Sequence, residues 1–422
     1  MKILSIETSC DETAISILEA EGNFDDVDNP VKFHILSDNL ISQIDIHKEY
    51  GGVFPALAKR EHSKNLIPIL RKTLTKALLG NQATKYYEIN DKIYKILERE
   101  PELLKLFLEY IPTIEIPDID AIAVTQGPGL EPALWVGINF AKALSLVWNK
   151  TLIPVNHMKG HLLASLVNPK SKVQSSKINN VNFPAIGLLI SGGHTELVLM
   201  KKWNSYEKIG QTRDDAVGEA FDKIARMMDL PYPGGPKISK LAHLQQENKS
   251  LSPLRTRCEI KLPRPMLNTD DFDFSFSGLK TAVLYLIKNL KKENNWVELP
   301  QEIKQQIALE FEEAVTEILL KKTQKAIEKF GAKTLIIGGG VTANNHIRQS
   351  FQSLGGSTSE LKFGSKASKL EVLMPDKAFS TDNAVMIGIA GYFKYLKQKK
   401  SGQLLDAADL EELQANGNLS FQ

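Results

Sequence analysis

Two kinds of segment each occur twice in the chain, in the same order. The first is strand, polar turn, strand: "KILSIETSCDETAISILE" begins at residue 2 and "PAIGLLISGGHTELVLMKKW" begins at residue 184. The second is strand, glycine turn, helix: "DIDAIAVTQGPGLEPALWVGINFAKALSL" begins at residue 118 and "AKTLIIGGGVTANNHIRQSF" begins at residue 332. Unrelated α/β proteins also yield such look-alikes, but the shared order favours a true duplication.

The duplication predicts an α/β fold of two lobes around a central cleft. We expect a first lobe at residues 1–154, completed by residues 380–400, and a second lobe at residues 155–379. Residues 401–422 are expected to form a polar C-terminal tail.

Residues 80–117 fit neither lobe. Their apolar residues recur with helical spacing on both sides of Pro101, which predicts two short amphipathic helices. We expect this helical insert to lie on the outside of the first lobe, so that a short linker could replace it without loss of folding.

The composition limits the class of protein. Hydrophobic residues make up 42% and charged residues 24% of the 422 residues, as in ordinary globular chains. The net charge of +2 neither requires nor excludes a nucleic-acid partner. Cys10 and Cys258 form no disulfide framework, and charge appears by Asp11, too early for the apolar core of a signal peptide. We therefore expect a cytoplasmic protein, and no apolar run is long enough to predict a membrane span.

Two histidines stand four residues apart in "NHMKGH". Residues at this spacing share one face of a helix, so His157 and His161 can reach one ion. They also fit an ordinary helix surface, because a metal needs at least a third ligand from elsewhere. "STDNAVMIG" offers Asp382 before a small-residue helix, where Asp is also favoured as an N-cap. The zinc-protease signature fails, because Met158 stands where that signature needs Glu.

Glycine-rich turns follow an apolar strand in each half. Ser191, Gly192 and Gly193 lie in "LLISGGHTEL", and Asn344 lies in "IIGGGVTANN", where a helix begins. Glycines let backbone N–H groups approach a phosphate, and a helix N-terminus suits an anion. A lone Gly-Gly turn is also a common hairpin, but two such loops favour a nucleotide site. Neither loop is a Walker A sequence.

Two groups of carboxylates are candidates for polar chemistry. In "DDAVGEAFDKIARMMDLPYPGGP", Glu219 and Asp222 share a helix face, and the Asp222 carboxylate can accept hydrogen bonds from ribose hydroxyls. An exposed acidic helix is the alternative. In "ETSCDET", Glu7, Asp11 and Glu12 lie on the first strand–turn–strand, where carboxylates can orient a metal or a nucleophile.

Together these motifs resemble one family, the bacterial tRNA N6-adenosine threonylcarbamoyltransferases (TsaD), formerly called glycoproteases. The matching motifs span residues 1 to about 395 in the family's order. They are "IETSCDETA", "YGGVFPALAKREH", "TQGPGL", "NHMKGH", "SGGHTEL", "DDAVGEAFDKIARMMDLPYPGGP", "DFSFSGLKTA", "GGGVTANN" and "STDNAVMIG". The insert and the tail fall outside the resemblance.

The resemblance implies a two-lobed fold like that of actin, Hsp70 and sugar kinases (the ASKHA fold). It implies transfer of a threonylcarbamoyl group from threonylcarbamoyl-adenylate to the N6 amine of the adenosine next to the anticodon in tRNAs reading ANN codons, with release of AMP. It also implies helper proteins, including a catalytically inactive paralogue and a small ATPase, and no membrane partner.

The resemblance also implies site residues. One divalent metal ion, iron or zinc, would be held by His157, His161 and Asp382. The implied substrate-binding set is Leu189, Ile190, Ser191, Gly192, Gly193, Asp222, Gly235 and Asn344. From the chemistry of amine attack we take Asp11 and Glu12 as catalytic candidates that position the amine or accept its proton.

Two features qualify these expectations. Family members often carry Glu where this chain has Lys159, and a cation there can weaken metal binding. With the lobe bounds above, the two lobes would share the ion.

The chain has no strongly basic stretch, and the best local candidate for a tRNA-binding patch consists of Arg255, Arg257, Lys261 and Arg264.

Two other functions stay open. An ATPase or small-molecule kinase of the same fold would hydrolyse or transfer phosphate rapidly and have no use for the histidine pair. A non-catalytic actin-like scaffold would tolerate loss of both histidines.

Overall fold

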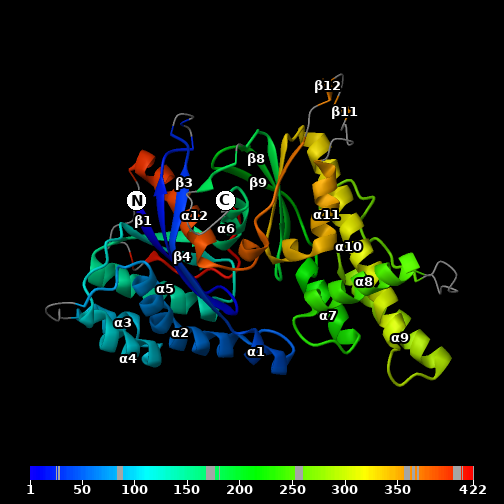
Figure 1. Ribbon diagram of the computed structural model, residues 1–422, viewed down its shortest axis with the longest axis horizontal. Coiled ribbons are helices and arrows are strands. Elements are labelled where there is room, and N and C mark those ends of the chain that lie inside the picture. Colours follow the sequence, from blue (N-terminus) through cyan, green and yellow to red (C-terminus); the bar gives the residue numbers. More distant parts are fainter. Residues whose placement is uncertain are drawn as a thin grey trace. The chain divides into compact units, whose positions relative to one another are not determined.

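The computed structural model divides into two compact units (Figure 1). One unit is Met1–Asn180 with Asp382–Gln422, and the other is Val181–Thr381. No helix in the described part of the chain is long and apolar enough to cross a membrane. The structure describes all residues except 25, 27, 28, 83–88, 168–175, 180, 252–259, 356–361, 364, 365, 368, 369, 403–409, 411 and 422.

The first unit is built on a six-stranded sheet with the order β5-β4-β1-β2-β3-β6. β1, β2 and β3 form an antiparallel meander, while β4 and β5 run parallel to β1 on its other side. The strands are β1 (Lys2–Glu7), β2 (Glu12–Glu21), β3 (Lys32–Ser42), β4 (Ala121–Gly127), β5 (Thr151–Asn156) and β6 (Ser176–Lys177).

The second unit repeats this plan with the order β13-β10-β7-β8-β9. β7, β8 and β9 are antiparallel, while β10 and β13 run parallel to β7. β11 (Lys362–Phe363) and β12 (Lys366–Ala367) pair separately. The strands of the main sheet are β7 (Ala185–Ile190), β8 (Thr195–Lys202), β9 (Ser205–Gln211), β10 (Thr334–Gly338) and β13 (Glu371–Leu373).

The two sheets share one topology. β1 and β2 correspond to β7 and β8, and β4 corresponds to β10, as the repeated sequence segments predict. A glycine turn and a helix follow β4 and β10 in turn, as expected from "TQGPGL" and "IIGGGVTANN". The predicted fold class, two duplicated α/β lobes, is confirmed.

Helices cover both faces of the first sheet. One face packs against the helices α2 and α5 through Leu4, Ile6 and their neighbours. The other face packs against α12, which also contacts α6 (Figure 1). The helices of this unit are α1 (Ile44–His47), α2 (Pro55–Lys76), α3 (Asp91–Ile96), α4 (Pro101–Tyr110), α5 (Glu131–Trp148), α6 (His157–Ala164) and α12 (Ala384–Ser401), with short 3-10 turns at Lys48–Tyr50 and Ile111–Thr113.

Long helices also cover the second sheet. α10, the longest of the described helices, contacts both α8 and β7. The helices of this unit are α7 (Val217–Met227), α8 (Gly234–Leu251), α9 (Ser277–Asn294), α10 (Gln301–Phe330) and α11 (Asn345–Leu354), with 3-10 turns η3 (Gly340–Ala343) and η4 (Lys377–Phe379).

Glycines bring α12 against the first sheet. A Cβ added at Gly388 would lie 2.2 Å from Leu18 Cδ2, and one added at Gly391 would lie 2.8 Å from Ala123 Cβ. Both distances are far below van der Waals contact, so only glycine permits this approach. The small-residue run in "NAVMIGIAG" is therefore a packing face, and it fixes where the first residues of α12 lie.

The insert forms the two expected helices, α3 and α4, and Pro101 begins the second. Its expected place on the outside of the lobe is wrong. Ile93, Leu97, Leu103 and Phe107 are fully buried and belong to the same core as α2, α5 and the sheet. The Phe107 ring packs edge-on against Phe140 of α5, 6.2 Å between centroids. Helical spacing identified the apolar face, but it could not show that the lobe's own core would take that face in.

Deleting the insert or truncating its apolar anchor should therefore destabilise the first unit. We expect Phe107→Ala to lower the free energy of unfolding by about 3–5 kcal/mol, because it removes a fully buried ring and leaves a cavity. Urea denaturation measures this change. The control is Tyr94→Ala, in α3 of the same insert, where the side chain is 47% exposed and little loss is expected. A Phe107 variant as stable as the control would mean that the insert packs on the surface of the lobe.

Candidate metal centre and nucleotide pocket

The three predicted metal ligands lie together. His157 and His161 lie on α6, directly after β5, and Asp382 lies two residues before α12. One ligand atom from each residue lies within 4.8 Å of the other two. His161 Nε2 is 2.9 Å and His157 Nε2 is 3.4 Å from the same oxygen, Oδ1 of Asp382. All three residues belong to the first unit, so the expectation that two lobes share the ion is not met.

The N-cap explanation for Asp382 does not hold in this fold. The side chain of Asn383 caps α12 by accepting the N–H of Met386 at 3.0 Å. The cap is thus already supplied by the neighbouring residue, while the Asp382 carboxylate reaches the two imidazoles. Asn156 caps α6 in the same way, accepting the N–H of Lys159 at 3.1 Å, and this sets the start of the helix that carries the histidines.

A buried carboxylate orients one of the imidazoles. Glu7, at the end of β1, is fully buried and accepts a hydrogen bond from His157 Nδ1–H at 3.1 Å. It also accepts the Thr125 hydroxyl at 2.6 Å and the Ser9 N–H at 2.5 Å. Because Nδ1 is engaged, His157 presents Nε2 toward Asp382. A carboxylate behind a histidine in this way is the usual support of a metal ligand.

The charges of this cluster favour a cation. Burial raises the pKa of Asp382 and of Glu7, but their partners together hold both pKa values below the usual range: His157 with His161 for Asp382, and His157 with Ser9 for Glu7. Burial lowers the pKa of His157, yet Asp382 and Glu7 together raise it well above its ordinary value. Two imidazoles and one carboxylate oxygen are a donor set that divalent iron or zinc accepts, with positions left for substrate. The residues present therefore fit one such ion.

The second unit holds a cavity of about 280 Å³ beside its glycine turns. Four of the predicted substrate-binding residues line it: Gly192, Asp222, Gly235 and Asn344. Leu189 and Ile190 are buried in β7 and serve the core. Among the described residues, Ser191 and Gly193 stand beside the lining of this cavity without forming part of it.

Backbone contacts bring the turn after β7 to the start of α7. The N–H groups of Gly218 and Glu219 donate to the carbonyls of Ser191 and Gly192 at 3.2 and 3.1 Å. A Cβ at Gly218 would lie 2.7 Å from the Ser191 carbonyl oxygen, so this contact requires glycine.

Close packing does not explain why glycines line the cavity. A Cβ added at Gly192 or Gly235 would meet no atom of the described structure within 4 Å, and neither residue has a positive φ. Neither packing nor backbone conformation accounts for glycine there. Open space over bare backbone amides is the form of a phosphate-binding loop.

Comparison with known proteins shows the family of the chain. Residues 34–85 and 102–389 match the family model described as TsaD, tRNA N6-adenosine threonylcarbamoyltransferase. The chain belongs to this family.

Curated relatives with the same name align over almost the whole chain. Those of Thermosipho africanus and Protochlamydia amoebophila are 40% and 41% identical, over 96% and 98% of this chain and 98% and 97% of their own. A relative from Persephonella marina is 38% identical over 96% of this chain and 93% of its own. The solved activator of 2-hydroxyisocaproyl-CoA dehydratase from Clostridium difficile is 11% identical, with a TM-score of 0.40, over 95% of this chain and 98% of its own.

Lys159, which the sequence resemblance marks as unusual, lies between the two histidines on α6. Lys159 is two positions from each histidine on α6, so it occupies a different face of the helix. Its ammonium lies 5.9 Å from the centroid of the Phe421 ring. Burial, with Lys397 and Lys394 nearby, lowers the pKa of Lys159 to about 8. Its charge is therefore held on the side of α6 away from the metal ligands.

The two catalytic candidates lie on the turn between β1 and β2. Asp11 is buried, and Glu12 begins β2. Burial and the charges of Asp11 and Asp382 raise the pKa of Glu12 well above its usual value. A carboxyl with a raised pKa holds its proton to higher pH than an ordinary glutamate does, which favours hydrogen-bond donation over proton removal. The catalytic roles of Asp11 and Glu12 stay predictions.

Sequence reasoning missed the support of Asn344. Its amide donates to Ser239 Oγ and to Glu312 Oε1, both at 2.7 Å, and its oxygen caps α11 by accepting the Ile347 N–H at 3.0 Å. Asn344 thereby ties α8, α10 and α11 together at the cavity. The one available signal was Glu312, a carboxylate on the buried face of α10.

The predicted tRNA-binding patch is described only in part. Arg255 and Arg257 lie outside the described residues, as does Cys258. Arg264 forms ion pairs with Glu310 at 2.6 Å and Glu317 at 2.9 Å, so acidic residues of α10 already balance its charge.

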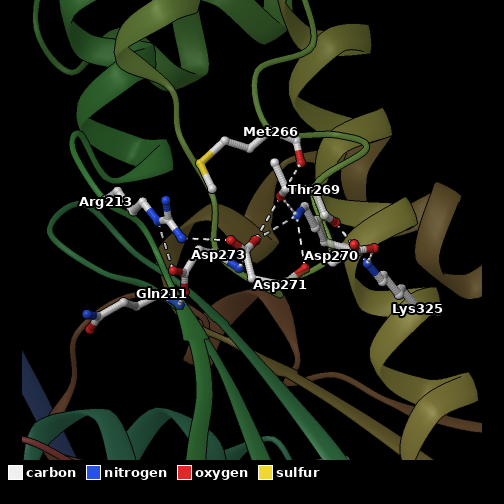
Figure 2. A network of polar contacts seen from close by, with 9 residues as sticks. Gln211, Arg213, Met266, Thr269, Asp270, Asp271, Asp273 and Lys325 are labelled. Atoms are coloured by element: carbon white, nitrogen blue, oxygen red, sulfur yellow. Dashed lines mark hydrogen bonds and ion pairs between the residues drawn. The ribbon is translucent and has the colours of Figure 1, made fainter.

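The segment after Arg264 is held by a polar network (Figure 2). Arg213 pairs with Asp271 at 2.7 Å and Asp273 at 2.9 Å, and Lys325 of α10 donates to the carbonyl of Thr269 at 2.8 Å. These contacts fix the chain that precedes α9 and indicate a structural role for this region.

A buried histidine behind the β1–β2 turn should make the fold sensitive to acid. His62 Nε2–H donates to the Cys10 carbonyl at 3.0 Å, and its Nδ1 accepts the Thr13 hydroxyl at 2.8 Å. Burial lowers the pKa of His62 to about 4 from 6.5. The unfolded chain therefore binds this proton first, and stability falls as pH drops from 6.5 toward 4, by roughly 3 kcal/mol in total.

Urea unfolding between pH 7.5 and pH 4.5 tests this expectation. We expect His62→Gln to flatten the pH dependence of the free energy of unfolding, whatever its effect at pH 7.5. His243→Gln, where the side chain is 67% exposed, is the control and should keep the wild-type slope. An unchanged slope in the His62 variant would mean that other groups cause the acid sensitivity.

Proposed function

We propose that the protein transfers a threonylcarbamoyl group from threonylcarbamoyl-adenylate to the N6 amine of the adenosine next to the anticodon, in tRNAs reading ANN codons, and releases AMP. The observation that carries the proposal is the match of nearly the whole chain to relatives named tRNA N6-adenosine threonylcarbamoyltransferase. The two sites described above contain the residue types that this reaction uses.

The cavity in the second unit is the proposed site for the adenylate. The amides around Gly192 and Gly235 would hold its phosphate, where open space lies over the backbone. Asp222 offers carboxylate oxygens to the ribose hydroxyls, and its Oδ1 is positioned by the Gly234 N–H at 2.7 Å. Holding the phosphate also stabilises the leaving group, because charge develops on it as the acyl–oxygen bond breaks.

In the transfer, the adenosine N6 forms a bond to the carbamoyl carbon, the bond from that carbon to the phosphate oxygen breaks, and the amine loses a proton. His157, His161 and Asp382 would hold one divalent ion, which when bound supplies Lewis acidity toward a substrate oxygen. Glu7 keeps His157 oriented. Asp11 would orient the amine and accept its proton, and Glu12, whose pKa is raised, would donate a hydrogen bond at the same turn.

The proposed reaction determines which partners the protein needs. tRNA is the acceptor, threonylcarbamoyl-adenylate is the donor, and we propose helper proteins that include a catalytically inactive paralogue and a small ATPase. A cytoplasmic location suits this chemistry, because tRNA is present there.

The decisive assay combines the protein, its helpers, threonylcarbamoyl-adenylate and unmodified tRNA, followed by mass spectrometry of the nucleosides. Threonylcarbamoyladenosine and an equal amount of AMP are expected. Nucleotide hydrolysis without modified nucleoside, with a relative active in the same assay, would favour the ATPase or kinase alternative instead.

The metal ligands can be tested by metal content. His157→Ala, His161→Ala or Asp382→Ala should each strongly reduce bound iron or zinc and the transfer rate, because two remaining ligands hold an ion poorly. Glu7→Gln should weaken metal affinity by about 10–100-fold through loss of support for His157. Elemental analysis of purified protein and circular dichroism give occupancy and folding. His243→Ala is the control. Full occupancy in the Asp382 variant would remove it from the ligand set.

The adenylate pocket can be tested at Asp222. Loss of a charge-assisted hydrogen bond costs about 1.5–3 kcal/mol, so Asp222→Ala should raise the KM for threonylcarbamoyl-adenylate by roughly 10–150-fold. Glu219→Ala, on the same helix and paired with Lys223, is the matched control. Equal KM values in the two variants would make Asp222 a structural residue that only positions Gly234.

A further inference from the structure

The first unit contains a second cavity, of about 530 Å³, that none of the proposed site residues lines. It lies between α5 on one side and α3, with the turn that follows it, on the other. Lys59 of α2 also borders it.

The α5 wall is one face of that helix. Pro132, Trp135, Asn139, Lys142 and Leu146 follow each other at intervals of three or four residues. Lys142 is only 8% exposed, and its ammonium lies 5.8 Å from the centroid of the Trp135 ring. This wall therefore combines an aromatic surface with a buried positive charge.

The opposite wall is cationic. Lys92, Lys95 and Arg99 have the spacing of one helical face and are all exposed. Within the part of the chain that the structure describes, no hydrogen bond or ion pair engages any of their three charged ends. Three such cations on one wall of a cavity repel each other unless an anion lies between them.

A buried carboxylate does not offset these charges. Glu100 is almost fully buried, lies 3.4 Å from the Lys59 ammonium and accepts a hydrogen bond from Asn139 at 3.3 Å. Lys59 thus balances Glu100. Among the lining residues that the structure describes, Lys92, Lys95 and Arg99 then face one further carboxylate, Glu98. This wall of the cavity is therefore positive, although the whole chain carries a net charge of only +2.

We propose that this cavity binds a small phosphorylated molecule with a flat ring, of the size of a nucleotide. The ring would lie against Trp135, and the phosphate would lie among Lys92, Lys95 and Arg99. Cavities of about 300–1,000 Å³ are typical for such ligands. An RNA backbone is the less suitable occupant, because Lys142 and the Trp135 wall lie inside the cavity, where a duplex cannot reach.

The proposal does not rest on threonylcarbamoyl transfer. Lys92, Lys95, Arg99 and Glu100 all fall between residues 85 and 102, the stretch that the family match leaves out. The cationic wall lies outside the residues that the family model matches and outside the cavity of the second unit, so a ligand there is separate from the adenylate.

Calorimetric titration of the full chain with inorganic phosphate, AMP, ADP and ATP tests the proposal. To isolate the site, the protein carries Asp222→Ala, which weakens the other pocket. We expect nucleotide binding to persist in this background, with AMP binding at least tenfold more tightly than phosphate. The triple change Lys92→Ala, Lys95→Ala and Arg99→Ala should weaken nucleotide binding at least tenfold. A matched triple, Lys48→Ala, Lys72→Ala and Lys105→Ala, removes as many charges from the same unit and should leave it unchanged.

The variant Trp135→Leu tests the contribution of the ligand's ring to binding separately from that of its phosphate. It should weaken AMP binding about tenfold and leave phosphate binding unchanged. Equal affinity for phosphate and AMP would overturn the assignment of a ring-bearing ligand. Nucleotide binding that is unchanged in the first triple variant would overturn the site itself, and a loss of tRNA binding alone in that variant would assign the wall to RNA.

Discussion

The close approach of α12 to the first sheet and to α6 is the contact on which the candidate metal centre depends. Gly388 and Gly391 let α12 lie on the sheet, and Gly160 of α6 has Met386 of α12 as its neighbour, 3.1 Å from an added Cβ. The chain that leaves the second unit therefore re-enters the first at a fixed place. Asp382 meets two histidines more than 200 residues earlier because these glycines, which have no side chain, let the helices and the sheet approach closely.

Glycines also allow a close approach of backbone segments in the second unit. Gly218 and Gly339 approach the carbonyls of Ser191 and Ile190, at 2.7 and 2.4 Å from their added Cβ atoms, and draw α7 and η3 to the turn after β7. At Gly192 no such neighbour exists in the described structure. Duplicated topology thus supplies two comparable turns: in the first unit Glu7 beside the turn orients His157 of the candidate metal site, whereas in the second the turn leaves bare amides, the form of an anion site.

Much of this was accessible from the sequence. The repeated segments predicted the matching sheets, and "NHMKGH" with Asp382 predicted a cluster that only folding could assemble. The contact between Glu7 and His157 was not predictable in detail, because it depends on how β1 and α6 meet across 150 residues. The same limit applies to Asn344, where the pattern indicated a helix start but not that Ser239 and Glu312 would occupy its amide.

The insert shows why periodicity predicts an element better than its place. Ile93 and Leu97 mark an apolar face, and the fold buries that face in the core of the first unit. Lys92, Lys95 and Arg99 mark the other face, which has no core to enter and so borders the cavity beside α5. Because a helix has two faces, one segment can extend a core and add a charged wall at once. The residues of the two candidate sites lie within the stretches that the family model matches, or before them, and this wall lies in the stretch between them.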